Sequence, residues 1–419
     1  MNELIRFIRE FIQNKGLFVF SAIFVGKISV FLTHVIAGRL LSKDEYGLIV
    51  LVLSVFAVFS TLSGMGSNQG LLRFGVLQKN DEDKDKLSAF VLRQGFVNHI
   101  FVTICFLIVG YLYVIKYQGI GLVIAFFGIR MIGGYFENYI QSYYRIFKDN
   151  KTFSILNITV SVAGLLMVAV GTYFFGIIGY LAGIALMPWF SLLYFKKPKK
   201  TQNFKSMNLN LKEFWSYSIH ASLTYFFSDL LFSMDFMLIG IMLDESSVAV
   251  YKAAVILPMN LAILPLIFMQ TDYPKLAENY KNKNYLKFYI RNYYKIFIPL
   301  GILCLVVGYF IKNYIVQLIY GDQYAGNGWV FFIILAAIVG NMCMRNLYGN
   351  LSAAIGKAHW NSYASLIAIG IVIGVSVWLI PIYGIMGAAI GMTAAFLFTG
   401  LFTMTLFNLY LKKLDDGKN

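Results

Sequence analysis

Long apolar runs follow one another along almost the whole chain, beginning at Gly16. Each run reaches about 20 residues, the length that a helix needs to cross the hydrocarbon core of a bilayer. Short polar segments separate the runs, and no interval between them is large enough for a soluble domain. The pattern predicts an all-α integral membrane protein with twelve transmembrane helices, at approximately 17–40, 46–66, 89–114, 119–144, 153–174, 177–195, 213–241, 248–271, 293–313, 329–354, 361–380 and 385–409.

The segment before the first run, MNELIRFIREFIQNKG, places Leu4, Ile8 and Ile12 on one face of a helix and keeps its arginines elsewhere. This pattern is typical of a helix that lies in the membrane interface. The apolar run that follows is too long for the hydrophobic region of a signal peptide, and it lacks a convincing cleavage site. We therefore expect no cleaved signal.

Composition agrees with a membrane protein: 59% of the residues are hydrophobic, 13% are charged, and the mean hydropathy is +0.69. The net charge of +15 could suggest a nucleic-acid partner, but the basic residues lie in the loops. With the N-terminus inside, about 27 of the 35 Lys and Arg residues fall on the cytoplasmic side and about 5 on the other. We therefore expect both termini in the cytoplasm, basic patches against the anionic lipid bilayer, and no nucleic acid.

Short stretches of the sequence recur at a constant spacing. FGIIGYLAG (175–183) matches YGIMGAAIG (383–391), and FKDNKTFS (147–154) matches IGKAHWNS (355–362), both at an offset of 208. LLSKDEYGLI also matches MLDESSVAVY at an offset near 202. The recurrence predicts two pseudo-symmetric six-helix lobes, residues 1–200 and 201–419, around a central cavity, related by an axis along the membrane normal.

Several charged side chains fall within the predicted spans, where each costs roughly 2.5–3.5 kcal/mol near the helix centre on insertion scales. They are therefore expected to face the protein interior. The set comprises Lys27, His34, His99, Arg130, Glu137, Asp229, Asp235 and Arg345.

Two interpretations of these charges stay open. In the first, Glu137 and Arg345, which are separated by the repeat offset of 208 residues, lie at equivalent depths in the two lobes. They then form a structural ion pair. Alternatively, Lys27, Arg130 and Arg345 supply cationic contacts for an anionic substrate group, with a carboxylate as a proton or ion site. Arginine suits phosphate because its planar fork binds two oxygens at once.

Neutral polar groups add to the expected cavity. Asn341, Asn346, Asn260 and Gln270 can form hydrogen bonds there, and Pro258 together with Pro265 would interrupt a helix backbone. Tyrosines such as Tyr135, Tyr139, Tyr143 and Tyr225 could stack on sugar faces. Ordinary packing is the favoured explanation for most of these tyrosines, and the interior histidines are favoured as satisfied structural groups.

Sequence signals for enzymes are missing. GNLSAAIGKA (349–358) lacks the glycine spacing and the hydroxyl residue of a phosphate-binding loop, and HExxH, CxxC and GxSxG do not occur. The three cysteines fall inside apolar runs, so neither a disulfide framework nor a metal site is expected. We expect a protein without a cofactor that is not an enzyme.

Five stretches of the sequence are typical of a known family. They are RLLSKDEYG (39–47), DFMLIGIMLDESSVAVYKAA (235–254), YGDQYAGNGWVFFIILAA (320–337), AIGKAHWNS (354–362) and IPIYGIMGAAIG (380–391). Through them the sequence resembles the polysaccharide biosynthesis family, the Wzx-type flippases of O-antigen and capsule repeat units, over nearly the whole chain. This family belongs to the MATE-like superfamily, which also holds multidrug exporters and the lipid II flippase.

The resemblance implies that undecaprenyl-pyrophosphate-linked oligosaccharide moves from the cytoplasmic to the periplasmic leaflet of the bacterial inner membrane by alternating access. It implies cavity cations on the first helices of each lobe, which Lys27 and Lys252 match. It assigns no coupling residue, so Glu137, Asp229 and Asp235 compete for a proton or sodium ion. Polymerase machinery is a possible partner, and the identity of the sugars stays open.

Two other functions are weighed against this one. A cation-coupled multidrug exporter is less favoured because the interior bases equal or exceed the interior acids. A membrane-embedded polymerase or transferase would be expected to carry catalytic groups on a sizeable outer loop, and the expected outer loops are short.

The predicted topology can be tested with reporters. A green fluorescent protein fused after Asn419 is expected to fluoresce, because the C-terminus is predicted to be cytoplasmic, where this reporter folds. Alkaline phosphatase fused at the same place should be inactive, whereas phosphatase fused after Gln118, in a predicted outer loop, should be active. Active phosphatase at the C-terminus would invert the topology.

Overall fold

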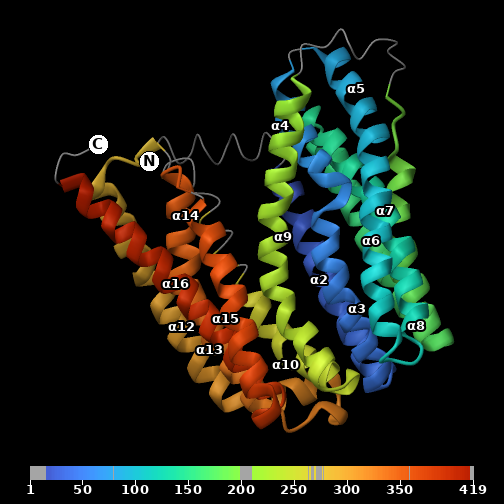
Figure 1. Ribbon diagram of the computed structural model, residues 1–419, viewed down its shortest axis with the longest axis vertical. Coiled ribbons are helices and arrows are strands. Elements are labelled where there is room, and N and C mark those ends of the chain that lie inside the picture. The colour runs from blue at the N-terminus through green and yellow to red at the C-terminus, as the bar shows by residue number, and fades with distance from the viewer. Residues whose placement is uncertain are drawn as a thin grey trace. The chain divides into compact units, whose positions relative to one another are not determined.

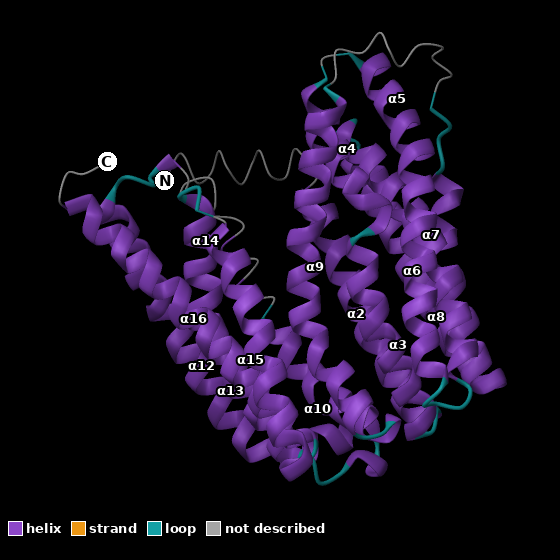
Figure 2. Ribbon diagram, in the orientation of Figure 1, coloured by secondary structure: helices purple, strands orange, loops and turns teal. Residues whose placement is uncertain are grey.

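The structure is a computed structural model that describes residues 16–78, 80–198, 210–262, 264–265, 269, 276, 278–357 and 359–415. All regular secondary structure in these ranges is helical (Figure 2). Ten of the helices are long and apolar enough to cross a membrane. The chain is therefore a multi-pass α-helical membrane protein. The interfacial helix expected near the N-terminus, Gln270 and most of the basic segment 196–205 lie outside the described residues.

The chain divides into two compact units, Met1–Phe226 (unit 1) and Phe227–Asn419 (unit 2). The boundary lies inside α9 (Leu211–Met242), because the first part of this helix packs within unit 1. The predicted lobe boundary at residue 200 falls in the range 199–209, which the structure does not describe.

Unit 1 consists of long helices interrupted by short irregular turns (Figure 1). Helix α2 packs along α8, and α7 packs against both α6 and α8. Its elements before α9 are α2 (Gly16–Leu40), α3 (Lys43–Thr61), η1 (Ser63–Gly66), α4 (Ser67–Leu77), α5 (Asp81–Phe90), η2 (Val91–Gly95), α6 (Phe96–Val114), α7 (Ile120–Ile146), α8 (Asn150–Leu186) and η3 (Met187–Tyr194).

Unit 2 has the same construction. Helix α16 packs along α15 and also contacts α13, which in turn packs on α12 (Figure 1). Its elements after α9 are α10 (Glu245–Leu261), α12 (Lys283–Tyr320), η5 (Asp322–Tyr324), α13 (Gly328–Asn341), η6 (Met342–Asn346), α14 (Leu347–Ala354), α15 (His359–Tyr383) and α16 (Ile385–Asp415).

Helix α8 turns back on itself at Gly176, where the backbone is left-handed in φ (φ 57°, ψ −136°). A Cβ added to Gly179 would collide with the backbone of Gly171, and one added to Gly183 would collide with the backbone of Val168. These contacts show two antiparallel segments that approach at glycines, as small residues allow in membranes. The segments correspond to the predicted spans 153–174 and 177–195.

The hairpin recurs in unit 2 between α15 and α16. Gly384 lies 208 residues after Gly176 and has nearly the same φ, 58°. Gly387 packs on the backbone of Leu379, and Gly391 packs on Ser376. The repeated glycine stretch therefore forms the same close-packed hairpin twice.

The other two sequence matches also repeat in local structure. Lys148 and Gly356, again 208 residues apart, both have positive φ, 58° and 79°. Ser42 and Asp244, 202 residues apart, both cap the N-terminus of a helix, α3 and α10 respectively. Such caps satisfy backbone N–H groups that have no partner within the helix. The three sequence matches therefore share local backbone features.

Two polar segments that lie mostly between predicted spans contain helix. Residues 73–93 include the end of α4 and all of α5, and α12 already begins at Lys283 within the segment 275–295. Helices therefore extend into the polar segments between the predicted spans, and the cytoplasmic placement of these segments stays a prediction. The acidic first turn of α5 also suits the positive end of a helix dipole.

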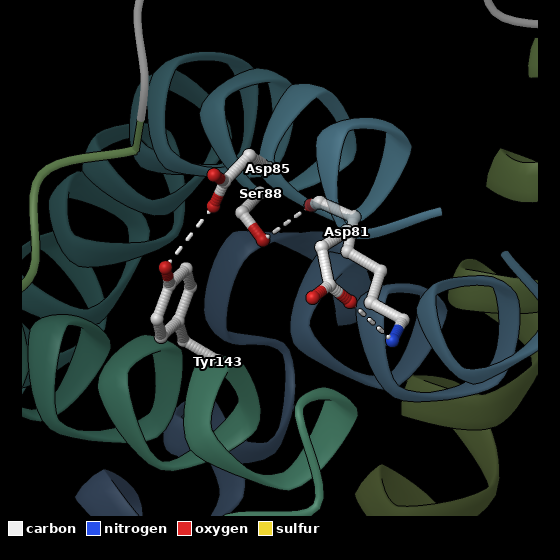
Figure 3. Close-up of polar contacts among 5 residues, drawn as sticks. Asp81, Asp85, Ser88 and Tyr143 are labelled. Carbon is white, nitrogen blue, oxygen red and sulfur yellow. Dashed lines mark hydrogen bonds and ion pairs between the residues drawn. The ribbon is translucent and has the colours of Figure 1, made fainter. Parts of the chain in front are cut away.

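Helix α5 is tied to α7 by a hydrogen bond in which Tyr143 Oη donates to Asp85 Oδ1 at 3.0 Å (Figure 3). Along α5, Lys84 Nζ lies 2.9 Å from Asp81 Oδ1, and Ser88 Oγ donates to the Lys84 carbonyl at 2.7 Å. The Tyr143 contact fixes the polar end of α5 against the neighbouring span.

Large apolar side chains are exposed along the helices of both units. Phe175, Phe310 and Trp378 each expose more than two thirds of their surface, 72%, 73% and 71%. Such surfaces are typical of contact with lipid rather than with water.

The glycine hairpin gives a stability prediction. Gly179→Ala should lower the melting temperature of the purified protein, because the added Cβ overlaps the Gly171 carbonyl and overpacking costs about 1–3 kcal/mol. Gly374→Ala is the matched control, since nothing lies within 4 Å of its added Cβ. Melting curves followed by size-exclusion fluorescence would decide; equal midpoints for both variants would contradict the packing described.

Candidate functional site

The span formed by α3 and α4 is broken in its middle. Gly64, Met65 and Gly66 all have left-handed backbone conformations, with φ of 58°, 51° and 75°. This conformation is uncommon for a non-glycine residue such as Met65 and marks local strain. Irregular backbone at membrane depth is tolerated where protein surrounds it or where it lines a polar cavity.

Close packing explains the two glycines at the break. A Cβ on Gly66 would collide with the Ser218 carbonyl of α9, and one on Gly64 would approach the ring of Tyr135 to 2.9 Å. The broken segment is therefore held between α7 and the first part of α9.

His99 joins the break to two neighbouring helices. Its Nδ1 lies 3.0 Å from Ser63 Oγ, and its Nε2 lies 2.9 Å from the Met131 carbonyl oxygen. Since the carbonyl can only accept, Nε2 carries the proton, and Nδ1 accepts from Ser63. The ring also stacks on Tyr135 with centroids 5.0 Å apart. His99 is thus a satisfied interior histidine, as expected, and so is His34, whose Nδ1 lies 3.1 Å from Tyr46 Oη.

Each unit contains a π-helical turn that is held by a buried tyrosine. In unit 1, Tyr135 Oη donates to the Val91 carbonyl of η2 at 2.6 Å. In unit 2, Tyr293 Oη donates to the Met342 carbonyl of η6 at 2.8 Å. In both cases the acceptor is the first residue of the turn. Single π-turns inside α-helices are frequent at functional sites.

A polar cavity of about 270 Å³ opens inside unit 1 at the broken span. It lies between the end of α3, the beginning of α4, one face of α7 and the first part of α9. Its lining residues are Ser60, Thr61, Ser63, Gly66, Asn68, Gln69, Leu72, Asn138, Gln141, Ser142, Arg145 and Tyr225. None of these lining residues carries a carboxylate.

Two carboxamides of the cavity wall have oxygen atoms without a donor among the described residues. Asn68 is 7% exposed, and within the described chain its Oδ1 has no hydrogen-bond partner. Gln141 uses its Nε2 to donate to Glu137 Oε1 at 3.0 Å and to Asn157 Oδ1 at 3.1 Å. Its own carbonyl oxygen is left to accept.

Arg130 faces aromatic side chains of its own unit. Its guanidinium lies 5.4 Å from the ring centroid of Phe56 and 5.9 Å from that of Phe127. It also interacts electrostatically with Glu137 and Tyr180. Arg130 and Glu137, seven residues apart on α7, thus belong to one cluster.

A second charged cluster lies in unit 2. Asp235 is fully buried and accepts from Tyr251 Oη at 2.8 Å and from the Phe236 N–H at 2.9 Å. Lys252 Nζ lies 5.0 Å from the Phe236 ring centroid and attracts the Asp235 carboxylate. The structure therefore brings Asp235 and Lys252 together on α9 and α10.

Arg345 lies within the π-turn η6. Its Nη2 donates to Ser365 Oγ at 3.2 Å, and its guanidinium lies 5.4 Å from the Phe232 ring centroid. Asn341 is 3% exposed, and among the described residues its Oδ1 finds no partner. Of these two predicted site residues in unit 2, Asn341 is therefore buried and Arg345 is half-buried.

The remaining predicted site residues have different surroundings. Lys27 is exposed, whereas His34, seven residues further along α2, is buried. Asp229 is half-buried on α9. The hydrogen-bond partners described for Glu137 and for Arg345 belong to the unit of each residue. An ion pair between Glu137 and Arg345 stays a prediction.

Hydropathy alone does not reveal the residues around the break. Asn68, Gln69 and Arg145 line the cavity, yet all three lie just beyond the predicted spans 46–66 and 119–144. The available signal was SGMGSNQG, in which three glycines and several uncharged polar residues interrupt an apolar run.

A model of the family described as polysaccharide biosynthesis protein matches residues 12–280. No protein of curated function matches the chain.

Three solved structures share the fold. An inward-facing multidrug resistance MATE family transporter of the MOP superfamily is 14% identical, with a TM-score of 0.72, and the alignment covers 94% of this chain and 96% of that one. The lipid II flippase MurJ in an inward closed conformation is 16% identical, with a TM-score of 0.67 and coverage of 95% and 90%. A MOP superfamily transporter from Pyrococcus furiosus is 14% identical, with a TM-score of 0.61 and 96% coverage of both chains.

The Asp235 cluster gives a second stability prediction. Tyr251→Phe should destabilise the protein by about 1.5–3 kcal/mol, because it removes a hydrogen bond to a buried carboxylate. Tyr363→Phe is the control, since this tyrosine is 58% exposed. Thermal unfolding of the two purified variants would test the difference, and a Tyr251→Phe protein as stable as the control would contradict the contact.

Proposed function

Because the chain belongs to the polysaccharide biosynthesis family, whose model matches well over half of it, we propose that it is a lipid-linked oligosaccharide flippase. Its substrate would be an undecaprenyl-pyrophosphate-linked repeat unit, moved from the cytoplasmic to the periplasmic leaflet of the bacterial inner membrane. The MOP-superfamily transporter fold supports a transport function rather than an enzymatic one.

The environment of Arg345 carries the proposal. Its one described hydrogen bond uses a single N–H and goes to a neutral hydroxyl, that of Ser365. A guanidinium has five N–H donors in a planar fork that matches phosphate oxygens. Most of these donors are therefore available to a pyrophosphate.

Transport would proceed by alternating access of twelve helices in two six-helix lobes around a central cavity. The pyrophosphate and the sugars would cross through the polar interior while the polyprenyl chain stays in lipid. Lys27, Lys252, Arg130 and Asn341 would assist Arg345 in contacting the headgroup. An ion gradient, of protons or sodium, would drive the cycle, with Glu137, Asp229 and Asp235 as candidate coupling or ion-pair residues.

A cation-coupled multidrug exporter is the alternative, since a MATE transporter shares the fold. The cavity in unit 1 argues against it, because cationic drugs need acidic or apolar surroundings and the lining residues carry no carboxylate. A membrane-embedded polymerase or transferase is a weaker third candidate, and such machinery would instead be a partner that uses the translocated product.

The direct test uses cells that lack the gene. Their lipid-linked saccharide should accumulate, and in spheroplasts it should stay unreachable by a probe confined to the outer side until the gene is restored. Accumulation of a reachable intermediate would place the protein after flipping and contradict the proposal. An unchanged intermediate would make drug export the function to test.

The cationic residues give a mutational prediction. Arg345→Ala and Lys27→Ala should each reduce translocation about tenfold or more, as the loss of a hydrogen bond to a charged group would. Arg345→Lys should fall between wild type and Arg345→Ala, because it keeps the charge and loses the fork. Lys357→Ala, at an exposed position after α14, is the matched control. Normal transport by both alanine variants, at normal levels of protein in the membrane, would contradict the proposed cationic binding site.

A further inference from the structure

We propose that the cavity at the broken span of unit 1 is a saccharide subsite that binds one sugar ring of the transported molecule. The inference rests on the proposed function and extends it. It separates recognition of the sugar, at the break between α3 and α4, from recognition of the pyrophosphate by cationic residues elsewhere in the protein.

The chemistry of the cavity wall matches a polyhydroxylated ligand. Hydroxyl groups and carboxamides dominate the lining, and both kinds of group donate and accept hydrogen bonds. Sugar hydroxyls have the same dual capacity. A cationic drug would instead need a carboxylate, and a phosphate would need more cationic groups than Arg145 alone provides among the lining residues.

Two carboxamide oxygens in the wall have no donor among the described residues. Asn68 Oδ1 is buried, in a side chain that is only 7% exposed. Gln141 is half-buried and donates from Nε2 to Glu137 and Asn157, so its oxygen is left to accept. A buried acceptor without a donor is unfavourable, and a ligand that carries several hydroxyl groups would supply donors to both oxygens.

The break itself adds donors from the backbone. The first N–H groups of a helix have no partner within that helix, and the helix dipole makes them favourable donors. Gly66, Asn68 and Gln69, at the beginning of α4, all line the cavity. The left-handed turn at residues 64–66 thus places the start of a half-helix at the ligand, which a continuous helix would not do.

Size and shape limit the ligand to about one ring. The cavity of about 270 Å³ lies just below the range of roughly 300–1,000 Å³ that is common for small-molecule pockets. Tyr225, 54% exposed, offers an aromatic face on which the apolar side of a sugar can stack. A whole repeat unit would extend beyond this space, so the subsite would select one sugar of the chain.

The test uses the full-length protein in lipid nanodiscs, because sugar-headed detergents would compete for the site. The probe is the oligosaccharide released by mild acid from the lipid-linked pool of the same cells and then dephosphorylated, and inorganic pyrophosphate is the second probe. Binding of each is measured by calorimetry. The wild-type protein is expected to bind both.

Asn68→Leu should weaken oligosaccharide binding about tenfold, by removing a hydrogen bond to the ligand, and leave pyrophosphate binding unchanged. Asn138→Leu is the second variant, because this cavity residue is exposed and its substitution leaves the core intact. Asn350→Leu is the control, a half-buried helical asparagine in unit 2 that donates to the Asn346 carbonyl. Unchanged oligosaccharide affinity in both cavity variants, or no binding to wild type, would overturn the subsite.

The spheroplast assay separates this inference from the proposed function. If flipping depends on the protein but the cavity variants bind oligosaccharide normally, the function stands and the subsite fails. If oligosaccharide binding depends on Asn68 and Asn138 but flipping does not depend on the protein, the subsite stands and the flippase proposal fails.

Discussion

The need to pair every backbone N–H and C=O group away from water governs this structure. Regular helices meet this need by themselves, so the irregular positions require partners from other helices. Tyr135 and Tyr293 donate to the first carbonyl of each π-turn, and His99 bonds to a carbonyl of α7 while holding Ser63 beside the broken span. Without these side chains, the turns would leave polar groups unpaired in an apolar environment.

The same irregular positions hold the candidate functional groups. Arg345 is part of the π-turn η6, and the polar cavity begins where Gly64 to Gly66 interrupt the second span. A straight helix would bury its polar backbone and present only side chains. A broken one also exposes backbone donors, which a polar headgroup can use in the interior of a membrane protein.

The duplication shows which features two copies of a fold share and which they do not. The turns at Gly176 and Gly384 have nearly the same φ, and in both hairpins a glycine of the second segment, Gly179 or Gly387, packs on the backbone of the first. Chemistry differs at matched positions: Glu137 lies in a continuous helix with Gln141 beside it, and Arg345 lies in a π-turn beside Ser365. The two units therefore offer different groups to a substrate on similar scaffolds.

The sequence by itself determined the apolar helices, the repeat and the family, because hydropathy and turn glycines are local properties of the chain. It also placed a set of charges within the predicted spans, of which Asp235, His34 and His99 are buried and Lys27 is exposed. Only the tertiary structure decided their partners, since His99 contacts Ser63 across 36 residues and Tyr135 contacts Val91 across 44. The cavity could not be predicted from the sequence for the same reason, because its wall comes from four separate helices. The break between α3 and α4 packs against Ser218 and Tyr135, and no local sequence pattern encodes these contacts.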